Sequence, residues 1–310
     1  MNDTFIPPFD FKAVFLDPWH NDAGGYVWIV LMGFLVILTC GLVGKFIVVR
    51  RMALMGDAIA HSLLPGIALA FLLTTSRMSS VMLLGAIGAG ILTTVLIELV
   101  YKNSRVKSDA ALGIVFSTLF ALGVILITVF ADKVDLDADC VLYGEIGFVP
   151  FEVPLQVAGL SLAPMPIIQM GAVTFFVVLI ICLFYKELLV TSFDPGLAKS
   201  LGINVNAFHY GLMIVLSIVV VSAFESVGAI LVIAMLIFPG VTASLFSDRL
   251  PVILWLVGLF SALYALSGLH LAIWLDCSIA GAMVVMAGLI FVIAWIFSPR
   301  RGLLRQLLRG

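Results

Sequence analysis

The stretch MALMGDAIAHSLLPGIALAF, residues 52–71, decides how this sequence is interpreted. It is apolar enough to cross a membrane, yet it carries Asp57 and His61 near its start. An ionisable side chain at the middle of a membrane helix costs on the order of 3 kcal/mol, so such residues are candidates for function. Because they are four residues apart, Asp57 and His61 share one face of a helix. Pro65 removes the amide that would bond to the His61 carbonyl, which predicts a kink.

The composition of the whole chain indicates a membrane protein. Of its 310 residues, 63% are hydrophobic and only 11% are charged, whereas a soluble domain carries about 25% charged residues. The expected fold is therefore all-α, a polytopic membrane helical bundle with about 8–9 transmembrane helices. Phe224, Glu225 and Ser226 interrupt one of the apolar runs, so the helix count depends on how 208–246 breaks. The candidate helices are 26–49, 57–75, 81–101, 109–131, 166–185, 208–224, 226–246, 251–275 and 277–297.

The distribution of basic residues predicts the orientation. Twelve of the sixteen Lys and Arg residues fall in one alternating set of loops and in the C-terminal tail. Basic loops stay in the cytoplasm, which places the N-terminus outside and the C-terminus inside. We expect an interfacial or extracytoplasmic segment at 1–25, a transmembrane domain at 26–297 and a basic cytoplasmic tail at 298–310. The first residues lack the basic and apolar regions of a cleaved signal peptide.

Several polar residues in the apolar runs have structural explanations. Glu98 and Lys102 are spaced to pair along one helix, and His270 falls at an interfacial helix end. The sequence suggests no role for His209. The four cysteines form no metal or disulfide motif and are interpreted as apolar filler and loop thiols.

The residues alone leave two interpretations of Asp57 and His61. A carboxylate oxygen with a neutral imidazole suits Mn²⁺, Fe²⁺ and Zn²⁺. Equally, an Asp–His hydrogen bond could only brace helix packing, since two side chains do not complete a metal shell. Glu225 is either a pore or gate residue or part of an exposed turn.

Three further motifs carry a resemblance to a known family. Together with residues 52–71, the stretches KSDAALGI, FDPGLAKSLGINVNAFHYGLM and SVGAILVIAMLIFPGVTASLFSDRLP follow one another in the order of that family. In these motifs the chain resembles the permease subunits of ABC importers for manganese, zinc and iron(II). The resemblance runs from about Lys45 to the last helix.

The resemblance implies a large-pore permease, similar in architecture to cobalamin importers, in a bacterial plasma (inner) membrane. It implies a second permease chain, identical or paralogous, a separate ABC ATPase subunit that binds ATP, and an extracytoplasmic metal-binding protein. The transported ion is Mn, Zn or Fe, and no permanently bound cofactor is expected. The family's GDAxxH motif makes Asp57 and His61 the metal residues, with Pro65 and Glu225 as possible gate or pore residues.

Two further regions receive roles by the same resemblance. A Pro-bounded cytoplasmic turn is expected to couple to the ATPase, with 191–207 beside it, through Pro239, Thr242, Ser247, Asp248, Arg249 and Pro251. An acidic outer segment is either a vestibule that concentrates cations or a plain solvated loop; its carboxylates are Asp135, Asp137, Asp139 and Glu145.

Other functional classes remain as alternatives. The chain has no GxxxxGK[ST] phosphate loop, so we do not expect it to hydrolyse ATP or to be an enzyme. The main alternative is a gradient-driven secondary transporter or channel in which Asp57 and His61 relay protons. A permease for a metal chelate would not need the two-residue site. An intramembrane hydrolase is disfavoured because HExxH is absent.

Overall fold

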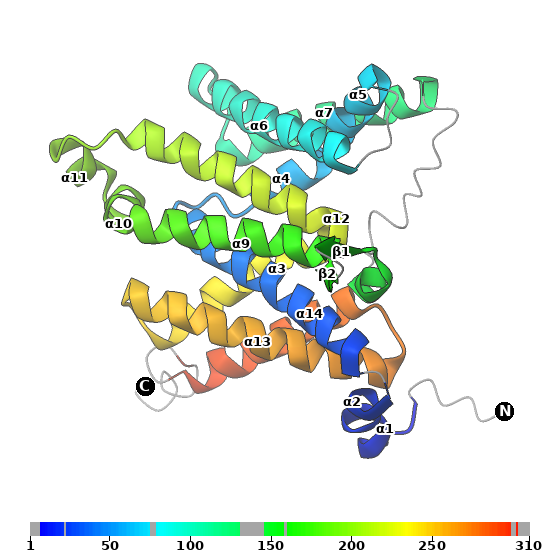
Figure 1. Cartoon of the computed structure of the whole chain (residues 1–310). Helices are drawn as coiled ribbons and strands as arrows, with labels where there is room; N and C mark the ends of the chain where they lie inside the picture. Colours follow the sequence, from blue (N-terminus) through cyan, green and yellow to red (C-terminus); the bar gives the residue numbers. More distant parts are fainter. Residues whose placement is uncertain are drawn as a thin grey trace. The chain divides into compact units, whose positions relative to one another are not determined.

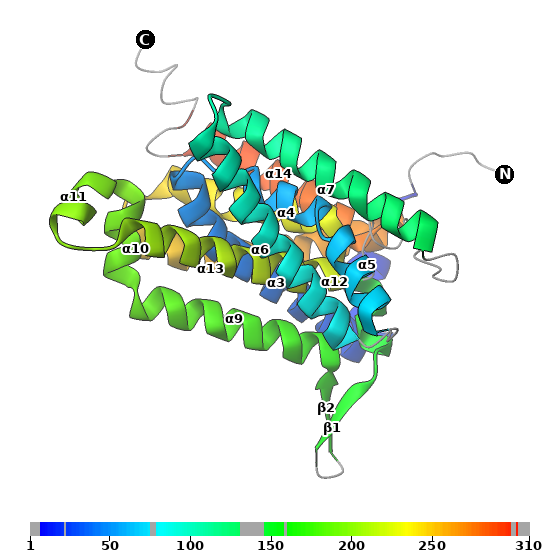
Figure 2. The ribbon, with the colours of Figure 1, turned by 90° about the horizontal axis from the view of Figure 1, so that it is seen from above.

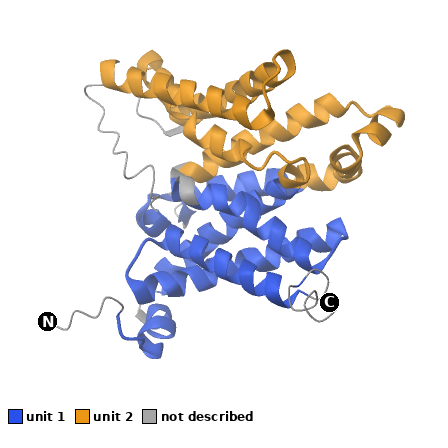
Figure 3. Ribbon diagram, turned by 180° about the vertical axis from the view of Figure 1, so that it is seen from behind, with its two compact units in different colours: residues 1–45, 140–178, 226–310 blue, residues 46–139, 179–225 orange. Residues whose placement is uncertain are grey.

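The computed structural model is helical almost throughout the residues that it describes, which are 7–21, 23–74, 79–130, 146–157, 160–298 and 302 (Figure 1). The chain divides into two compact units (Figure 3). Unit 1 comprises residues 1–45, 140–178 and 226–310. Unit 2 comprises residues 46–139 and 179–225, and it contains the Asp57–His61 stretch.

The predicted all-α membrane bundle is confirmed. Over the described part of the chain, eight helices are long and apolar enough to cross a membrane. They are α3 (Ala23–Val49), α4 and α5 taken together (Met55–Thr74), α6 (Ser79–Asn103), α7 (Ser108–Phe130), α9 (Met165–Leu183), the first part of α12 (Val205–Phe246), α13 (Leu250–Leu275) and α14 (Ile279–Phe297).

The ninth candidate helix is the second part of α12. Gly228 has a φ of 76° and a ψ of 170°, so the helix breaks there. Glycine adopts this conformation without the penalty that a Cβ imposes. The expected interruption at Phe224–Ser226 therefore falls slightly later in the chain. The apolar helix beyond it, Leu231–Phe246, is shorter than the eight spans.

Unit 1 combines long helices with a small hairpin. α13 packs against α14, and α1 (Phe11–Phe15), followed by α2 (Asp17–Asn21), packs against α13. A 3₁₀ helix, η1 (Ile146–Phe151), leads to the antiparallel strands β1 (Pro154–Val157) and β2 (Leu160–Pro164). Figure 2 shows this hairpin projecting from the beginning of α9. The sequence analysis did not predict it, because four- and five-residue strands carry little periodicity.

Unit 2 is built around a tight group of helices. α5 packs against both α6 and α7, and the shorter α4 contacts the same two helices (Figure 1). Gly66 of α5 faces Gly85 of α6 so closely that a Cβ on Gly66 would collide with the Gly85 carbonyl. Small residues at such a crossing let the two backbones approach, which is typical of membrane helix pairs. This unit also contains α10 (Tyr185–Phe193), α11 (Pro195–Ser200) and the first part of α12.

Candidate functional site

The stretch that opened the sequence analysis forms two helices. α4 covers Met55–His61 and α5 covers Leu64–Thr74. The expectation of one helix kinked by Pro65 was wrong, because the helix ends at His61 and a new one begins at Leu64. Pro65 occupies the first turn of α5, where a missing amide leaves no helical hydrogen bond unmade.

Hydrogen bonds of Ser62 hold this break in place. The Ser62 amide donates to the carbonyls of Ala58 and Ile59, which closes the end of α4. The Ser62 hydroxyl lies 2.7 Å from the hydroxyl of Thr93 on α6, and both side chains are buried. The break is therefore tied to a neighbouring helix, and the position of His61 next to it is well defined.

Asp57 and His61 lie together on α4, as their spacing predicted. Nε2 of His61 is 3.2 Å from Oδ1 of Asp57. The side chain of His61 is 39% exposed and that of Asp57 is 36% exposed, which leaves room for a further ligand. Asp57 is in the first turn of α4, where the helix dipole favours negative charge. On the other side, the His61 ring packs near Phe116 and Phe120 of α7, with centroids 5.9 and 6.1 Å apart.

The pair supplies two metal-ligating groups, a carboxylate through oxygen and an imidazole through nitrogen. Over the part of the chain that the structure describes, no group of three or more His, Cys, Asp or Glu side chains is arranged to hold a metal ion. Asp57 and His61 can bind a divalent ion only weakly by themselves, because a full shell needs at least four ligands. The arrangement fits transient contact better than permanent binding.

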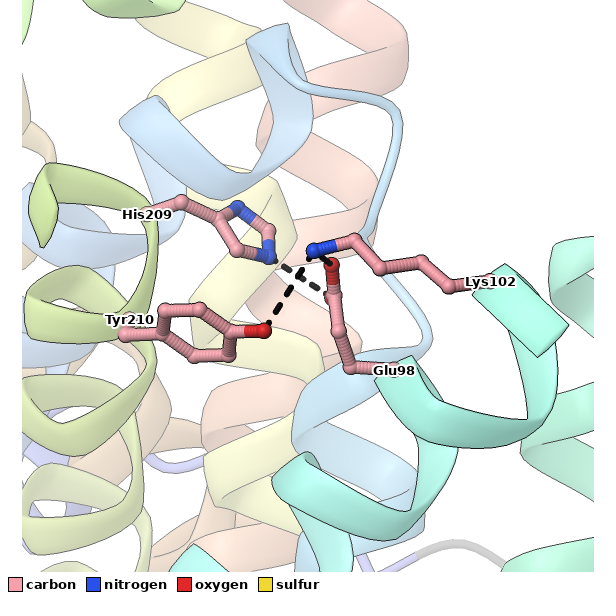
Figure 4. A network of polar contacts seen from close by, with 4 residues as sticks. All are labelled: Glu98, Lys102, His209 and Tyr210. Atoms are coloured by element: carbon pink, nitrogen blue, oxygen red, sulfur yellow. Dashed lines mark hydrogen bonds and ion pairs between the residues drawn. The ribbon is translucent and has the colours of Figure 1, made fainter. Parts of the chain in front are cut away.

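A second carboxylate–imidazole pair lies elsewhere in unit 2. Lys102 Nζ donates to Glu98 Oε1 at 2.7 Å, which confirms the pairing expected from their spacing. His209, to which the sequence assigned no role, places Nε2 2.9 Å from Glu98 Oε2. Lys102 also donates to the hydroxyl of Tyr210 at 3.3 Å, so four side chains from α6 and α12 form one network (Figure 4).

The proposed coupling residues do not form one turn. Pro239 and Thr242 lie inside the second part of α12, and the turn before α13 contains only residues 247–249. Thr242 is fully buried and accepts a hydrogen bond from Tyr264 at 2.9 Å. Ser247 accepts a hydrogen bond from the amide of Arg249 at 3.1 Å. Of the other expected coupling residues, Asp248 lies in this turn and Pro251 lies in the first turn of α13.

The segment 191–207 contains a short capped helix, α11. Asp194 accepts a hydrogen bond from the Leu197 amide at 2.9 Å, and Pro195 begins the helix. Gly202, with a φ of 77°, terminates it. Asp at the N-cap, Pro at the first position and Gly after the end are sequence signals of a helix. The letters DPGLAKSLG therefore carried enough information to predict α11, which the sequence analysis missed.

Arg50 anchors the neighbouring helix α10. Its guanidinium donates to the hydroxyls of Ser192 and Thr191, each at 3.1 Å. Burial lowers the pKa of Arg50 below its usual value, but an arginine remains charged at any physiological pH. The end of α3 is thereby connected to the segment that leads into α11.

Two groups of candidate residues lie outside the described structure. Glu225 belongs to α12, but its side chain is outside the described residues. The same holds for the whole of the acidic outer segment with Asp135, Asp137, Asp139 and Glu145.

The fold and the site define a class of protein. Among the described residues, eight helices are long and apolar enough to cross a membrane, which indicates a multi-pass membrane protein. PsaBC from Streptococcus pneumoniae, solved in complex with a Fab, superposes with a TM-score of 0.78 at 34% identity, over 96% of this chain and 99% of that chain. A putative metal-chelate type ABC transporter in an inward-facing conformation has a TM-score of 0.64 at 18% identity, which shows a similar fold.

Sequence comparison identifies the family. The profile of the ABC 3 transport family matches residues 26–298, so this chain belongs to that family. The manganese transport system membrane protein MntD of Bacillus subtilis is 44% identical over 282 residues, which is 91% of this chain and 95% of that protein. The zinc transport system membrane protein TroD of Treponema pallidum is 45% identical over 280 residues, 90% of this chain and 76% of that protein. The resemblance found from the motifs is confirmed.

Proposed function

We propose that this chain is the transmembrane permease of an ABC importer that carries a divalent metal ion into the cytoplasm. The observation that carries the proposal is the identity of 44–45%, over about nine tenths of the chain, with permeases named for manganese and for zinc. Manganese and zinc are therefore the first candidates. Iron(II), expected from the motifs, appears in neither of these names and stays a prediction.

Asp57 and His61 are the proposed metal contacts along the pathway. Their oxygen and nitrogen atoms are 3.2 Å apart, and both side chains are partly exposed. A carboxylate with an imidazole suits divalent manganese and zinc ions. Water or a second permease chain supplies the remaining ligands in this proposal. An incomplete shell allows the ion to leave as well as enter, as transport requires.

Residues next to the pair receive subsidiary roles. Pro65 begins α5 directly after the break, and we retain it as a pore residue because it fixes the helix geometry beyond His61. Glu225 is retained as a gate residue because α12 breaks three residues later, at Gly228. The acidic outer segment, with Asp135 to Glu145, is retained as a cation-concentrating vestibule.

The energy for transport comes, in this proposal, from ATP on a separate ABC ATPase subunit. An extracytoplasmic metal-binding protein delivers the ion, and a second permease chain completes the pathway. The sequence of this chain has no phosphate-binding loop of its own. In this proposal the C-terminus lies in the cytoplasm and the N-terminus outside, as the distribution of basic residues predicts.

α11 is a further candidate for ATPase contact. The residues around it include Phe193, Leu197 and Leu201, which are 55%, 49% and 62% exposed. Exposed apolar residues on a short helix outside the spans are available to a partner protein. Of the coupling residues expected at 239–251, Thr242 is fully buried and Ser247 is only 7% exposed, whereas Asp248, Arg249 and Pro251 are exposed. We therefore retain these three exposed residues and add residues 193–202 to the proposed contact.

Reconstitution in proteoliposomes tests the proposal. The chain is purified with its ATPase subunit. Uptake of manganese, zinc and iron(II) is then measured separately, with ATP or ADP supplied on the side of the membrane that carries the ATPase. ATP-dependent uptake of manganese or zinc is expected. Uptake by the permease alone, driven by a proton gradient without ATP, would contradict the importer and support the secondary transporter. Unchanged uptake by the Asp57→Ala variant would contradict the site while leaving the importer class intact.

A further inference from the structure

The N-terminal segment is fastened to one end of α13. Val14 is only 4% exposed, and its carbonyl accepts a hydrogen bond from Nδ1 of His270 at 3.0 Å. Trp274 Nε1 donates to the carbonyl of Pro7 at 3.2 Å. These contacts lie within unit 1, and they give His270 a definite role in place of the general interfacial one expected from the sequence. One face of α1 is thus committed to protein contact.

The other face of this segment displays phenylalanines. Phe9 and Phe11 are 57% and 62% exposed, and Phe15 is 38% exposed. The three rings are not scattered, because Phe15 stacks on Phe11 at 5.0 Å and meets Phe9 edge-on at 6.5 Å. Phe9 also contacts Trp274 at 5.3 Å. We call Phe9, Phe11 and Phe15 the aromatic patch. A contiguous exposed apolar patch usually marks a surface that something covers.

The short connection to α3 determines the depth of the aromatic patch relative to the bilayer. α2 ends at Asn21 and α3 begins at Ala23, so the patch is joined to a membrane-spanning helix by very little chain. α3 has 27 residues, which corresponds to a length of about 40 Å and exceeds the roughly 30 Å hydrocarbon core. Its first turn therefore lies at the edge of the bilayer. α13 ends at Leu275, one residue after the Trp274 that contacts the patch.

We propose that the aromatic patch inserts into the headgroup region of the bilayer, at the end of the molecule where α3 begins and α13 ends. The occupant of the patch is phospholipid, at the boundary between headgroups and acyl chains. Interfacial segments typically carry Phe, Trp or Leu on the face that they bury at this depth, and Trp is enriched at the membrane interface. Exposed Lys12 and Asp10 alternate with the phenylalanines, so the same segment can meet both headgroups and acyl chains.

This inference depends on the membrane-spanning fold and not on the transported ion. It assigns different tasks to neighbouring residues. Val14 docks on protein and Phe11 meets lipid, while Phe9 and Phe15 contact Trp274 and His270 and turn their exposed parts to lipid. In consequence α1 fastens the end of α13 at the membrane surface. Loss of the patch should loosen this attachment without unfolding the bundle.

Spin-label depth measurements test the proposal. The four native cysteines are replaced by serine, and a nitroxide is attached at residue 11 or, as the matched control, at residue 12 of the full chain in phosphatidylcholine–phosphatidylglycerol nanodiscs. Collision of each label with oxygen, which partitions into lipid, is compared with collision with a water-soluble nickel chelate. A label at residue 11 is expected to favour oxygen, and a label at residue 12 to favour nickel.

Three outcomes overturn the proposal. Preference for nickel at both positions means that the patch lies in water, and protection of residue 11 from both reagents means that protein covers it. A second variant, Phe9→Ser with Phe15→Ser, carries the label at residue 11. Its oxygen preference is expected to fall toward that of residue 12, while its elution as a folded protein is unchanged. An unaltered oxygen preference in this folded variant also contradicts the proposal.

Discussion

Two carboxylate–imidazole pairs in unit 2 have the same chemistry and opposite surroundings. Asp57 and His61 lie on one short helix, and their side chains are 36% and 39% exposed. Glu98 and His209 come from two helices, and their side chains are only 11% and 19% exposed. Lys102 occupies the other oxygen of Glu98, 2.7 Å away. Among the described residues, no third His, Cys, Asp or Glu side chain joins the Asp57–His61 pair.

The difference shows how partners separate a candidate binding site from a structural one. A carboxylate that already accepts bonds from an ammonium and an imidazole has little to offer an incoming cation. A carboxylate with one partner and an exposed edge retains lone pairs for a ligand. We therefore interpret the Glu98 network as a clasp between α6 and α12, and the Asp57 pair as a contact for the transported ion. Four changes break or sharpen this comparison.

Asp57→Ala or His61→Ala should have the largest effect, and it should fall on transport. Loss of one metal-ligating side chain from a set of two is expected to reduce metal uptake at least about 10- to 100-fold, because even the outer-shell partners of metal ligands have effects of that size. The measurement is ATP-driven uptake at matched protein levels. Asp109→Ala, which removes an exposed carboxylate from the first turn of α7, is the control and should transport normally.

Glu98→Ala should act on stability instead. It leaves His209 and Lys102 without their common acceptor. Each hydrogen bond to a charged group contributes about 1.5–3 kcal/mol to stability. Thermal unfolding followed by size-exclusion chromatography should show the loss. Transport per folded molecule should persist. A variant that keeps its unfolding temperature but loses uptake would show that Glu98 belongs to the pathway.

Ser62→Ala tests whether the break before α5 positions the exposed pair. The hydroxyl bond to Thr93 spans two helices at 2.7 Å, and its loss is expected to cost about 1 kcal/mol. Uptake should fall less than in Asp57→Ala. Thr93→Val should have the same effect, and the double variant should be less than additive because both changes remove one bond. Full additivity would mean that the two hydroxyls act independently.

Lys102→Met should have the smallest effect. The lysine side chain is 48% exposed, and exposed ion pairs contribute only about 0.2–1 kcal/mol. His209 continues to donate to Glu98, so the clasp is weakened and not opened. Addition of 1 M salt should produce a similar small loss in the unaltered protein and none in the variant, because screening removes the same interaction. A large loss would mean that Lys102 holds the two helices together.

Local patterns of the sequence predicted much of the fold. Long apolar runs identified the spans, because a helix in lipid must satisfy its own backbone and needs about 20 apolar residues. The i, i+4 spacing placed Asp57 beside His61 and Glu98 beside Lys102, since both pairs lie within single helices. The capping signals around α11 are equally local, and they are sufficient to predict that helix.

Other features required the tertiary structure. His209 meets Glu98 across 111 positions of the chain, and no periodicity relates residues so far apart. The break after α4 is joined to another helix by the contact between Ser62 and Thr93, which no local pattern around Pro65 could predict. The sequence predicts a turn that begins at Pro239, yet α12 continues through this residue to Phe246.

The sequence by itself therefore determined the membrane class, the spans and the one-helix face that carries Asp57 and His61. Only the tertiary structure decided which of two similar pairs stays open to a ligand. The physical reason is that side-chain spacing within a helix is a property of the backbone repeat, whereas exposure and partner count depend on which helices pack together. Asp57 stays 36% exposed, whereas Glu98 is occupied because α12 brings His209 to it.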